Sequence, residues 1–104
     1  MSTLISSQLF RNETIIAEKQ QNKDYGVAVS PEFEVDGETF RVILDGHHSY
    51  EAAIRDGVEP EFHEASEQED DRLCVLNSGE IEDFLSLAWI DTNYYDVSTG
   101  REVW

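Results

Sequence analysis

The sequence is poor in basic residues, and this shortage excludes several kinds of function. Only 7 of its 104 residues are Lys or Arg, against 23 Asp or Glu, so the formal net charge is -16 at pH 7. Proteins that bind nucleic acid through the phosphate backbone need Lys and Arg to displace counterions. The composition therefore argues against direct binding of nucleic acid and, for the same reason, against binding an anionic membrane surface.

Cysteine and long apolar runs are scarce as well. Cys74 is the only cysteine, which excludes an intrachain disulfide and a cysteine-based zinc site and fits a reducing, cytoplasmic environment. No segment approaches the ~20 apolar residues that span a bilayer. The first residues also lack the basic region and apolar run of a signal peptide. We therefore expect neither export nor integration into a membrane.

What the sequence does contain is sufficient for one folded domain. Hydrophobic residues make up 39% of the chain and aromatic residues 11%, so a core can form despite the charge. We predict a single domain over residues 1–104. Residues 1–11 are too apolar for a free tail, because they include Leu4, Ile5, Leu9 and Phe10, and are expected to pack as an N-terminal arm or short strand.

Alternation of apolar and polar residues predicts a β-hairpin over residues 27–45. The turn is Asp36-Gly37, a dipeptide that suits the positive φ angles of a type I′ turn. Pro31 interrupts the first half, which indicates an edge position or a bulge.

Helix signals surround the hairpin. Asn12 can cap a helix running to about residue 22. A second helix is predicted over residues 50–57, where Gly57 suits a left-handed C-terminal position, and a short strand over 58–62 follows. With the preceding strand, these elements predict a compact βαβ-like unit with a right-handed crossover.

The C-terminal half predicts a solvated acidic loop, a strand, a helix and a hairpin. Residues 59–72 hold seven carboxylates, and residues 73–76 are expected to form a buried strand with Cys74 as an inert thiol. Ser78 is expected to cap a helix with one apolar stripe: Ile81, Phe84, Leu85, Ala88 and Trp89. Residues 93–104 predict a terminal hairpin. The fold class expected from all these elements is α+β, with α/β-like character.

The turn from Asp45 to Ser49 is the stretch whose residues favour a binding site. A buried strand ends at Gly46 and a helix begins at once, so backbone N–H groups at the helix N-terminus point into the turn. The side chains of His47, His48 and Ser49 add donors. This arrangement predicts an anion site.

These residues resemble the ParB/sulfiredoxin-like superfamily, whose small α/β domain has a glycine and histidine turn leading into a helix with paired alanines. Asp45 to His48 reproduces the Asp-Gly-His-His form of this turn, and Tyr50, Ala52 and Ala53 match the helix. Ser49 stands where the sulfiredoxin-like form has arginine. The resemblance implies that Gly46, His47, His48 and Ser49 hold a nucleotide or phosphate, often with Mg²⁺.

Other interpretations of the same residues stay open. His47 and His48 can instead cap the helix or pack beneath the hairpin. Asp45 and His63 can orient the ligand or bind a metal. The aromatic residues near the C-terminus, Tyr94, Tyr95 and Trp104, are expected in the core or in hairpin pairs. These residues do not decide whether the chain is an enzyme.

A second hypothesis assigns function to the acidic surface. Like phage and plasmid inhibitors that imitate nucleic acid, a carboxylate array can engage a basic, nucleic-acid-binding partner by electrostatic steering. The acidic partner face expected on this reading consists of Glu64, Glu67, Glu69, Asp70 and Asp71. A third alternative is that the charge only maintains solubility in a salt-rich cell.

Overall fold

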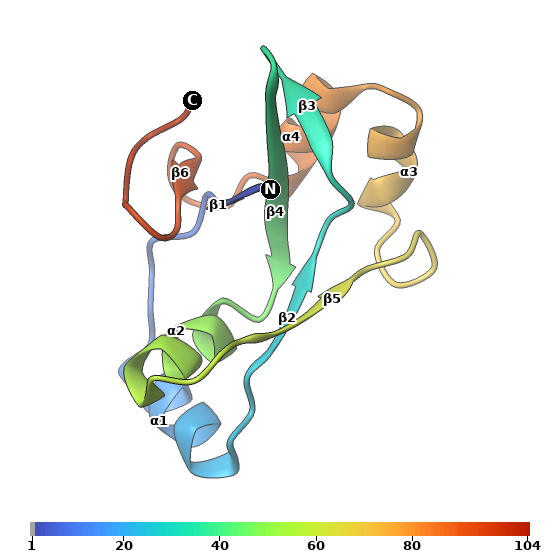
Figure 1. Cartoon of the computed structure of the whole chain (residues 1–104). Helices are drawn as coiled ribbons and strands as arrows, with labels where there is room; N and C mark the ends of the chain where they lie inside the picture. The colour runs from blue at the N-terminus through green and yellow to red at the C-terminus, as the bar shows by residue number, and fades with distance from the viewer. Residues whose placement is uncertain (1) are drawn as a thin grey trace.

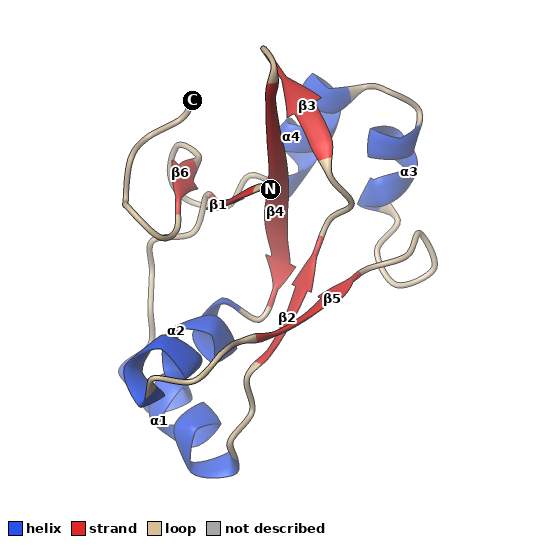
Figure 2. Ribbon diagram, viewed as in Figure 1, coloured by secondary structure: helices blue, strands red, loops and turns tan. Residues whose placement is uncertain are grey.

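The computed structural model describes residues 2–104 and has an α+β fold in which helices pack around one mixed sheet (Figure 1). Figure 2 separates the two kinds of element. The elements in chain order are β1 (Thr3–Ser6), α1 (Glu13–Asn22), β2 (Gly26–Val29), β3 (Phe33–Val35), β4 (Glu38–Asp45), α2 (His47–Asp56), β5 (Glu61–Glu64), α3 (Arg72–Asn77), α4 (Ile81–Ala88) and β6 (Tyr95–Asp96).

Strand β4 is the centre of the sheet. It pairs antiparallel with β3 and with β2, and its other edge pairs in parallel with β1, where Ile5 lies opposite Val42. Asp36 and Gly37 both have positive φ, of 53° and 83°, between β3 and β4. The predicted hairpin and its turn are therefore confirmed.

The interruption at Pro31 lies between β2 and β3. Ser30 keeps the segment attached to β4 there, because its N–H donates to Val42 O at 2.9 Å and its Oγ accepts from Val42 N at 3.0 Å. The pairing register of β2 with β4 also shifts between Ala28 and Val29. The Ser30 hydroxyl thus takes the place of the backbone carbonyl that would accept from Val42 N in a regular ladder.

The parallel pairing expected of a βαβ unit does not form between β4 and β5. Strand β5 instead pairs in parallel with β2, which is itself antiparallel to β4, and the sheet order is β5-β2-β4-β1-β6. Both edges of β4 are occupied, by β2 and β3 on one side and β1 on the other. The free edge of β2 is therefore the place where β5 can add.

Helices α1 and α2 pack together at one end of the sheet (Figure 1). The predicted cap is confirmed, because Asn12 Oδ1 accepts from Thr14 N at 2.9 Å and Ile15 N at 3.2 Å. Gly57 has φ 67° at the end of α2, also as predicted. The fixed helix ends place the Asp45–Ser49 turn against α1.

The main core lies between the sheet and helices α3 and α4, and α3 corrects one prediction. The apolar run of residues 73–76, expected as a strand, belongs to this helix. Leu73 and Leu76 are buried, and Cys74 between them is exposed rather than buried. Positions three apart lie on one face of a helix, so two leucines suffice to anchor α3 while the thiol faces solvent.

Helix α4 begins later than expected and buries less of its stripe. Ser78 does not cap it but ends α3, where its Oγ donates to Cys74 O at 2.9 Å. Phe84 and Ala88 are buried in the core, whereas Trp89 is 54% exposed. The helix stops at Ala88, so Trp89 lies on extended backbone and leaves the packed face.

Both ends of the chain join the sheet. The expected N-terminal arm, apart from Met1 outside the described residues, contains β1, with Ile5 fully buried. The expected C-terminal hairpin is present in short form: β6 pairs with β1, and Gly100 N donates to Asp96 O at 2.7 Å. Within residues 2–104, the helices are too short or too polar to cross a bilayer.

Candidate functional site

Gly46 joins β4 to α2 at a point where no other residue fits. Its φ is 94°, and a Cβ there would lie 2.4 Å from Gly26 O and 3.0 Å from the Cα of Val27. The backbone of β2 therefore approaches the turn too closely for a side chain. The first helical hydrogen bond of α2 runs from Tyr50 N to Gly46 O at 2.8 Å, so the N–H groups of residues 47–49 have no partner within the helix.

A hollow of about 300 Å³ opens at this turn. Its lining comprises the predicted Asp45, Gly46, His47, His48 and Ser49 together with Gln8, Ile15 and Lys19. The structure thus brings five of the predicted site residues to one place. The three further lining residues were not predicted. Ile15 and Lys19 reach the hollow because α1, which carries them, packs on α2.

His47 is a buried residue that connects α2 to β1. It is 5% exposed, and its Nε2 lies 2.7 Å from the hydroxyl of Ser6, which is itself fully buried. Burial lowers the pKa of His47 to about 4, with a smaller contribution from the charge of Arg11. The imidazole is therefore neutral at pH 7 and is held by the protein.

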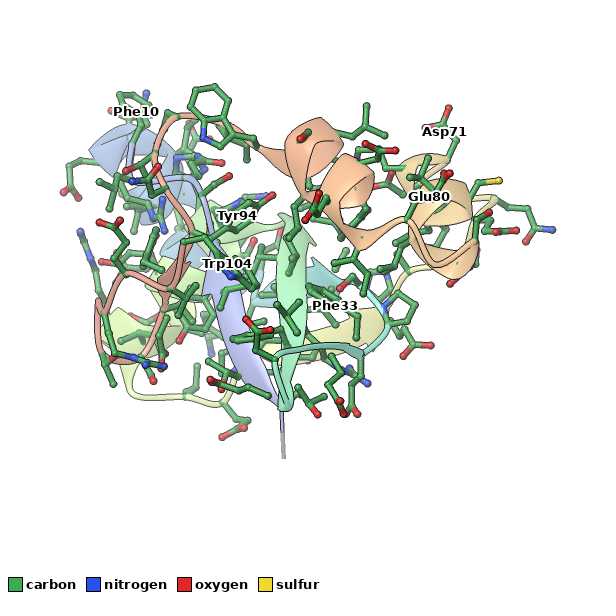
Figure 3. All side chains as sticks on the ribbon, turned by 90° about the horizontal axis from the view of Figure 1, so that it is seen from above. Phe10, Phe33, Asp71, Glu80, Tyr94 and Trp104 are labelled. Carbon is green, nitrogen blue, oxygen red and sulfur yellow. The ribbon has the colours of Figure 1, made fainter. Side chains whose placement is uncertain are left out.

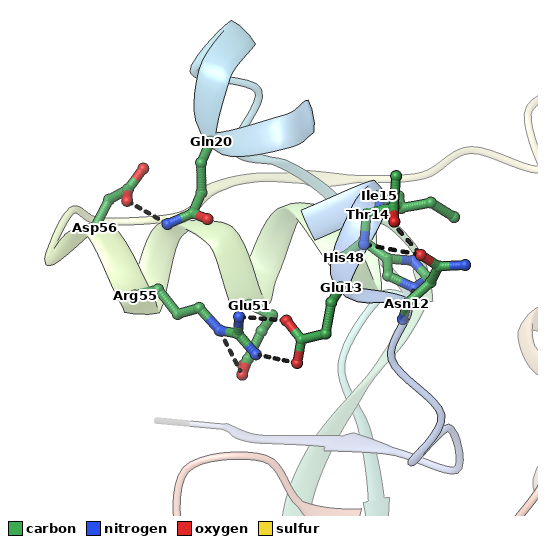
Figure 4. A network of polar contacts seen from close by, with 9 residues as sticks. All are labelled: Asn12, Glu13, Thr14, Ile15, Gln20, His48, Glu51, Arg55 and Asp56. Atoms are coloured by element: carbon green, nitrogen blue, oxygen red, sulfur yellow. Dashed lines mark hydrogen bonds and ion pairs between the residues drawn. The ribbon is translucent and has the colours of Figure 1, made fainter. Parts of the chain in front are cut away.

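His48 and Ser49 also have partners within the chain. His48 Nε2 accepts from Asn12 N at 3.1 Å, so the start of α2 is attached to the start of α1 (Figure 4). Burial, with Arg11 and Lys19 nearby, lowers the pKa of His48. The hydroxyl of Ser49 is buried and donates weakly to Asp24 Oδ1 at 3.5 Å. Both side chains face protein groups.

Asp45 and His63 are not brought together. Each lies opposite Ala28, on different sides of β2, so one strand separates them. Asp45 Oδ1 accepts from Gly46 N at 2.9 Å. His63 Nε2 lies 3.1 Å from Glu69 Oε2, and this hydrogen bond lowers the pKa of Glu69. In the described part of the chain, His, Cys, Asp and Glu side chains do not form a group of three able to hold a metal ion.

The predicted acidic partner face is divided between free and engaged carboxylates. Asp70 accepts from Arg72 Nε at 2.9 Å, and this contact lowers the pKa of Asp70. Glu64 lies 3.3 Å from Arg41 Nη2. Glu69 bonds His63, and Glu67 accepts from Asn77 Nδ2 at 3.1 Å. Asp71, labelled in Figure 3, is exposed at the start of α3 with no side-chain hydrogen bond to that helix.

The Asp45–Ser49 turn therefore offers backbone N–H groups rather than free histidines, together with one cation, Lys19, which is already paired with Asp24 at 2.9 Å. An anion there would meet the positive end of α2 but also the exposed carboxylate of Asp45. Comparisons of the chain with protein-family models, with curated proteins and with solved structures found no match.

Proposed function

We propose that the chain is an acidic interaction protein that binds a basic partner, of the kind that itself binds nucleic acid. The observation that carries this proposal is the internal use of the few cations. Five of them form ion pairs with carboxylates of the same chain: Lys19–Asp24, Arg41–Glu64, Arg55–Glu13, Arg72–Asp70 and Arg101–Glu38. These pairs leave Arg11 and Lys23 as the remaining cations of the sequence.

The surviving charge is concentrated rather than uniform. No Lys or Arg occurs in residues 73–100, and the exposed residues Glu80, Glu82 and Asp83 gather at the start of α4. In contrast, Arg55 binds Glu13 through two nitrogens, at 2.6 and 3.1 Å, and offsets part of the negative charge where α1 meets α2 (Figure 4). A field of one sign over one region steers oppositely charged partners toward that region.

The test is capture at low salt followed by measured affinities. The protein is immobilised, and a matched resin carrying polyglutamate is used in parallel, so that proteins held more strongly by the protein than by a simple polyanion can be identified. We expect the specific partners to be basic and nucleic-acid-binding, and their affinity in solution to fall roughly tenfold or more from 50 to 500 mM NaCl, because salt screens exposed charges. Partners that are not basic, or whose affinity does not change with salt, would contradict the proposal.

A second candidate function is binding of a nucleotide or phosphate at the Asp45–Ser49 turn. It is favoured by the hollow of about 300 Å³ at the start of α2, which Lys19 also lines. Asp45 is the carboxylate that lines this hollow, so Mg²⁺ would arrive on the nucleotide and keep most of its water. The resemblance to ParB/sulfiredoxin-like domains supports the same site.

Calorimetry with ATP, ADP, CTP and inorganic phosphate, with and without Mg²⁺, tests this second function. We expect binding heat that is lost in Lys19→Gln and kept in Lys23→Gln, because Lys23, at the C-cap of α1, does not line the hollow. Absence of heat for all four compounds at millimolar concentration, with circular dichroism showing a folded protein, excludes the site.

A further inference from the structure

One face of α4 is bordered by two adjoining hollows. The first, of about 330 Å³, is lined by Leu85, Ser86, Trp89 and Tyr94. The second, of about 420 Å³, is lined by Val35, Asp36, Ile81, Glu82, Leu85 and Trp104. The two hollows share Leu85, and we name the surface that they make up together the α4 groove. Figure 3 labels Tyr94 and Trp104, whose rings lie close together.

The aromatic side of the α4 groove is fixed by contacts of its own. The ring of Trp104 packs on Phe40, with centroids 4.9 Å apart, and edge-on against Tyr94 at 5.9 Å. The hydroxyl of Tyr94 donates to Leu85 O at 2.7 Å and so connects the aromatic residues to α4. A surface that is already ordered loses little conformational entropy when a partner binds.

The α4 groove exposes more apolar surface than the core requires. Ile81, Leu85 and Trp89 follow one another at intervals of four; Ile81 and Leu85 are only partly buried against the core, whereas Phe84 and Ala88 are buried in it. Trp89 remains 54% exposed and Trp104 remains 37% exposed. Exposed tryptophans beside aliphatic residues are typical of the residues that contribute most to protein interfaces.

Carboxylates lie beside the second of these two hollows. Asp36 and Glu82 line the α4 groove directly. Glu38 and Glu102 line a further hollow of about 180 Å³, which shares Asp36 and Trp104 with the groove. The cation in that hollow, Arg101, is paired with Glu38 at 3.6 Å. Carboxylates next to an apolar surface are complementary to apolar anchors flanked by Lys and Arg.

We propose that the α4 groove binds a positively charged amphipathic segment of the partner protein. Its apolar side chains would rest on Leu85, Trp89 and Trp104, and its Lys or Arg side chains would reach Asp36 and Glu82. A second copy of this chain is disfavoured as occupant because it would bring two sets of carboxylates together. This inference rests on the proposed interaction function and names the surface that performs it.

Selection from a random peptide display library, using the full chain as bait, tests the α4 groove. We expect enriched peptides to combine Lys or Arg with aliphatic or aromatic anchors. Trp89→Ala and Leu85→Ser should each weaken binding of the purified peptides at least tenfold. The matched control is Leu87→Ala, since Leu87 is 53% exposed on the same helix but lines neither hollow of the groove. Glu82→Gln should weaken binding less and flatten its salt dependence.

The inference would be overturned by no enrichment, by enriched peptides that are acidic or neutral, or by binding that Trp89→Ala and Leu85→Ser leave unaffected. Concentration-dependent dimerisation abolished by the same variants would assign the groove to a second copy and also overturn it. These experiments distinguish failure of the α4 groove from failure of the proposed function. If basic partners are captured in a salt-dependent way but bind both variants normally, the acidic interaction stands and only the α4 groove is wrong.

Discussion

Gly46→Ala should destabilise the protein far more than the same change at Gly57. Both glycines have positive φ, 94° and 67°, so each alanine incurs about 1–2 kcal/mol of backbone strain. At Gly57 the new Cβ meets nothing within 4 Å, whereas at Gly46 it meets a backbone oxygen of β2 at 2.4 Å. Forcing β2 aside adds about 1–3 kcal/mol, as overpacking does elsewhere.

The expected loss in free energy of unfolding is therefore about 2–5 kcal/mol for Gly46→Ala and about 1–2 kcal/mol for Gly57→Ala. Against a total stability of about 5–15 kcal/mol, this difference is large. Urea unfolding followed by circular dichroism measures both variants under one condition. If the two agreed to within about 0.5 kcal/mol, the close approach of β2 to the turn would not be the reason for glycine at position 46.

Three further predictions follow from burial. Burial lowers the pKa of His47 to about 4, while the unfolded value is near 6.5, so the neutral imidazole's contribution to stability is complete above pH 6.5 and is lost as the pH falls toward 4. At pH 5 the free energy of unfolding of the wild type should have fallen by about 2 kcal/mol relative to that of His47→Gln. Parallel pH profiles of the two free energies would contradict this. Phe84→Ala removes a fully buried ring and should cost about 3–5 kcal/mol in thermal or urea unfolding, whereas a loss below about 1 kcal/mol would place Phe84 outside the core. Cys74 is exposed, so dithionitrobenzoate should label the native protein without urea; labelling only after unfolding would refute its exposure.

Local signals predicted the elements that depend on neighbouring residues. Asp36-Gly37 fixes its turn because both residues adopt positive φ, and Asn12 caps its helix through bonds to residues two and three positions ahead. The strand predicted over residues 73–76 was wrong because a run of four apolar residues suits a strand and one helical turn equally. The predicted pairing of β5 with β4 was wrong for another reason, because the partner of β5 depends on which sheet edge is already occupied.

The position of the candidate turn was predictable, but the hydrogen-bond partners of its side chains were not. His47 meets Ser6 and His48 meets Asn12, across 41 and 36 residues of sequence. The periodicity of apolar residues in the sequence does not predict contacts between residues so far apart in the chain. The same holds for the α4 groove, because the stripe that includes Leu85 and Trp89 predicts an apolar face without saying how much of it the core will cover.

The pairing of β1 has a consequence for how the chain folds. Residue 5 pairs with residue 42 on one side and residue 96 on the other, so the sheet combines contacts that are very distant in sequence. Such topologies close slowly, because loop entropy is lost before the contacts form. During synthesis β1 can join β4 once residue 45 has emerged, but its second edge stays open until β6 follows. That open edge, with its unpaired N–H and C=O groups, is the segment of the nascent chain most exposed to aggregation.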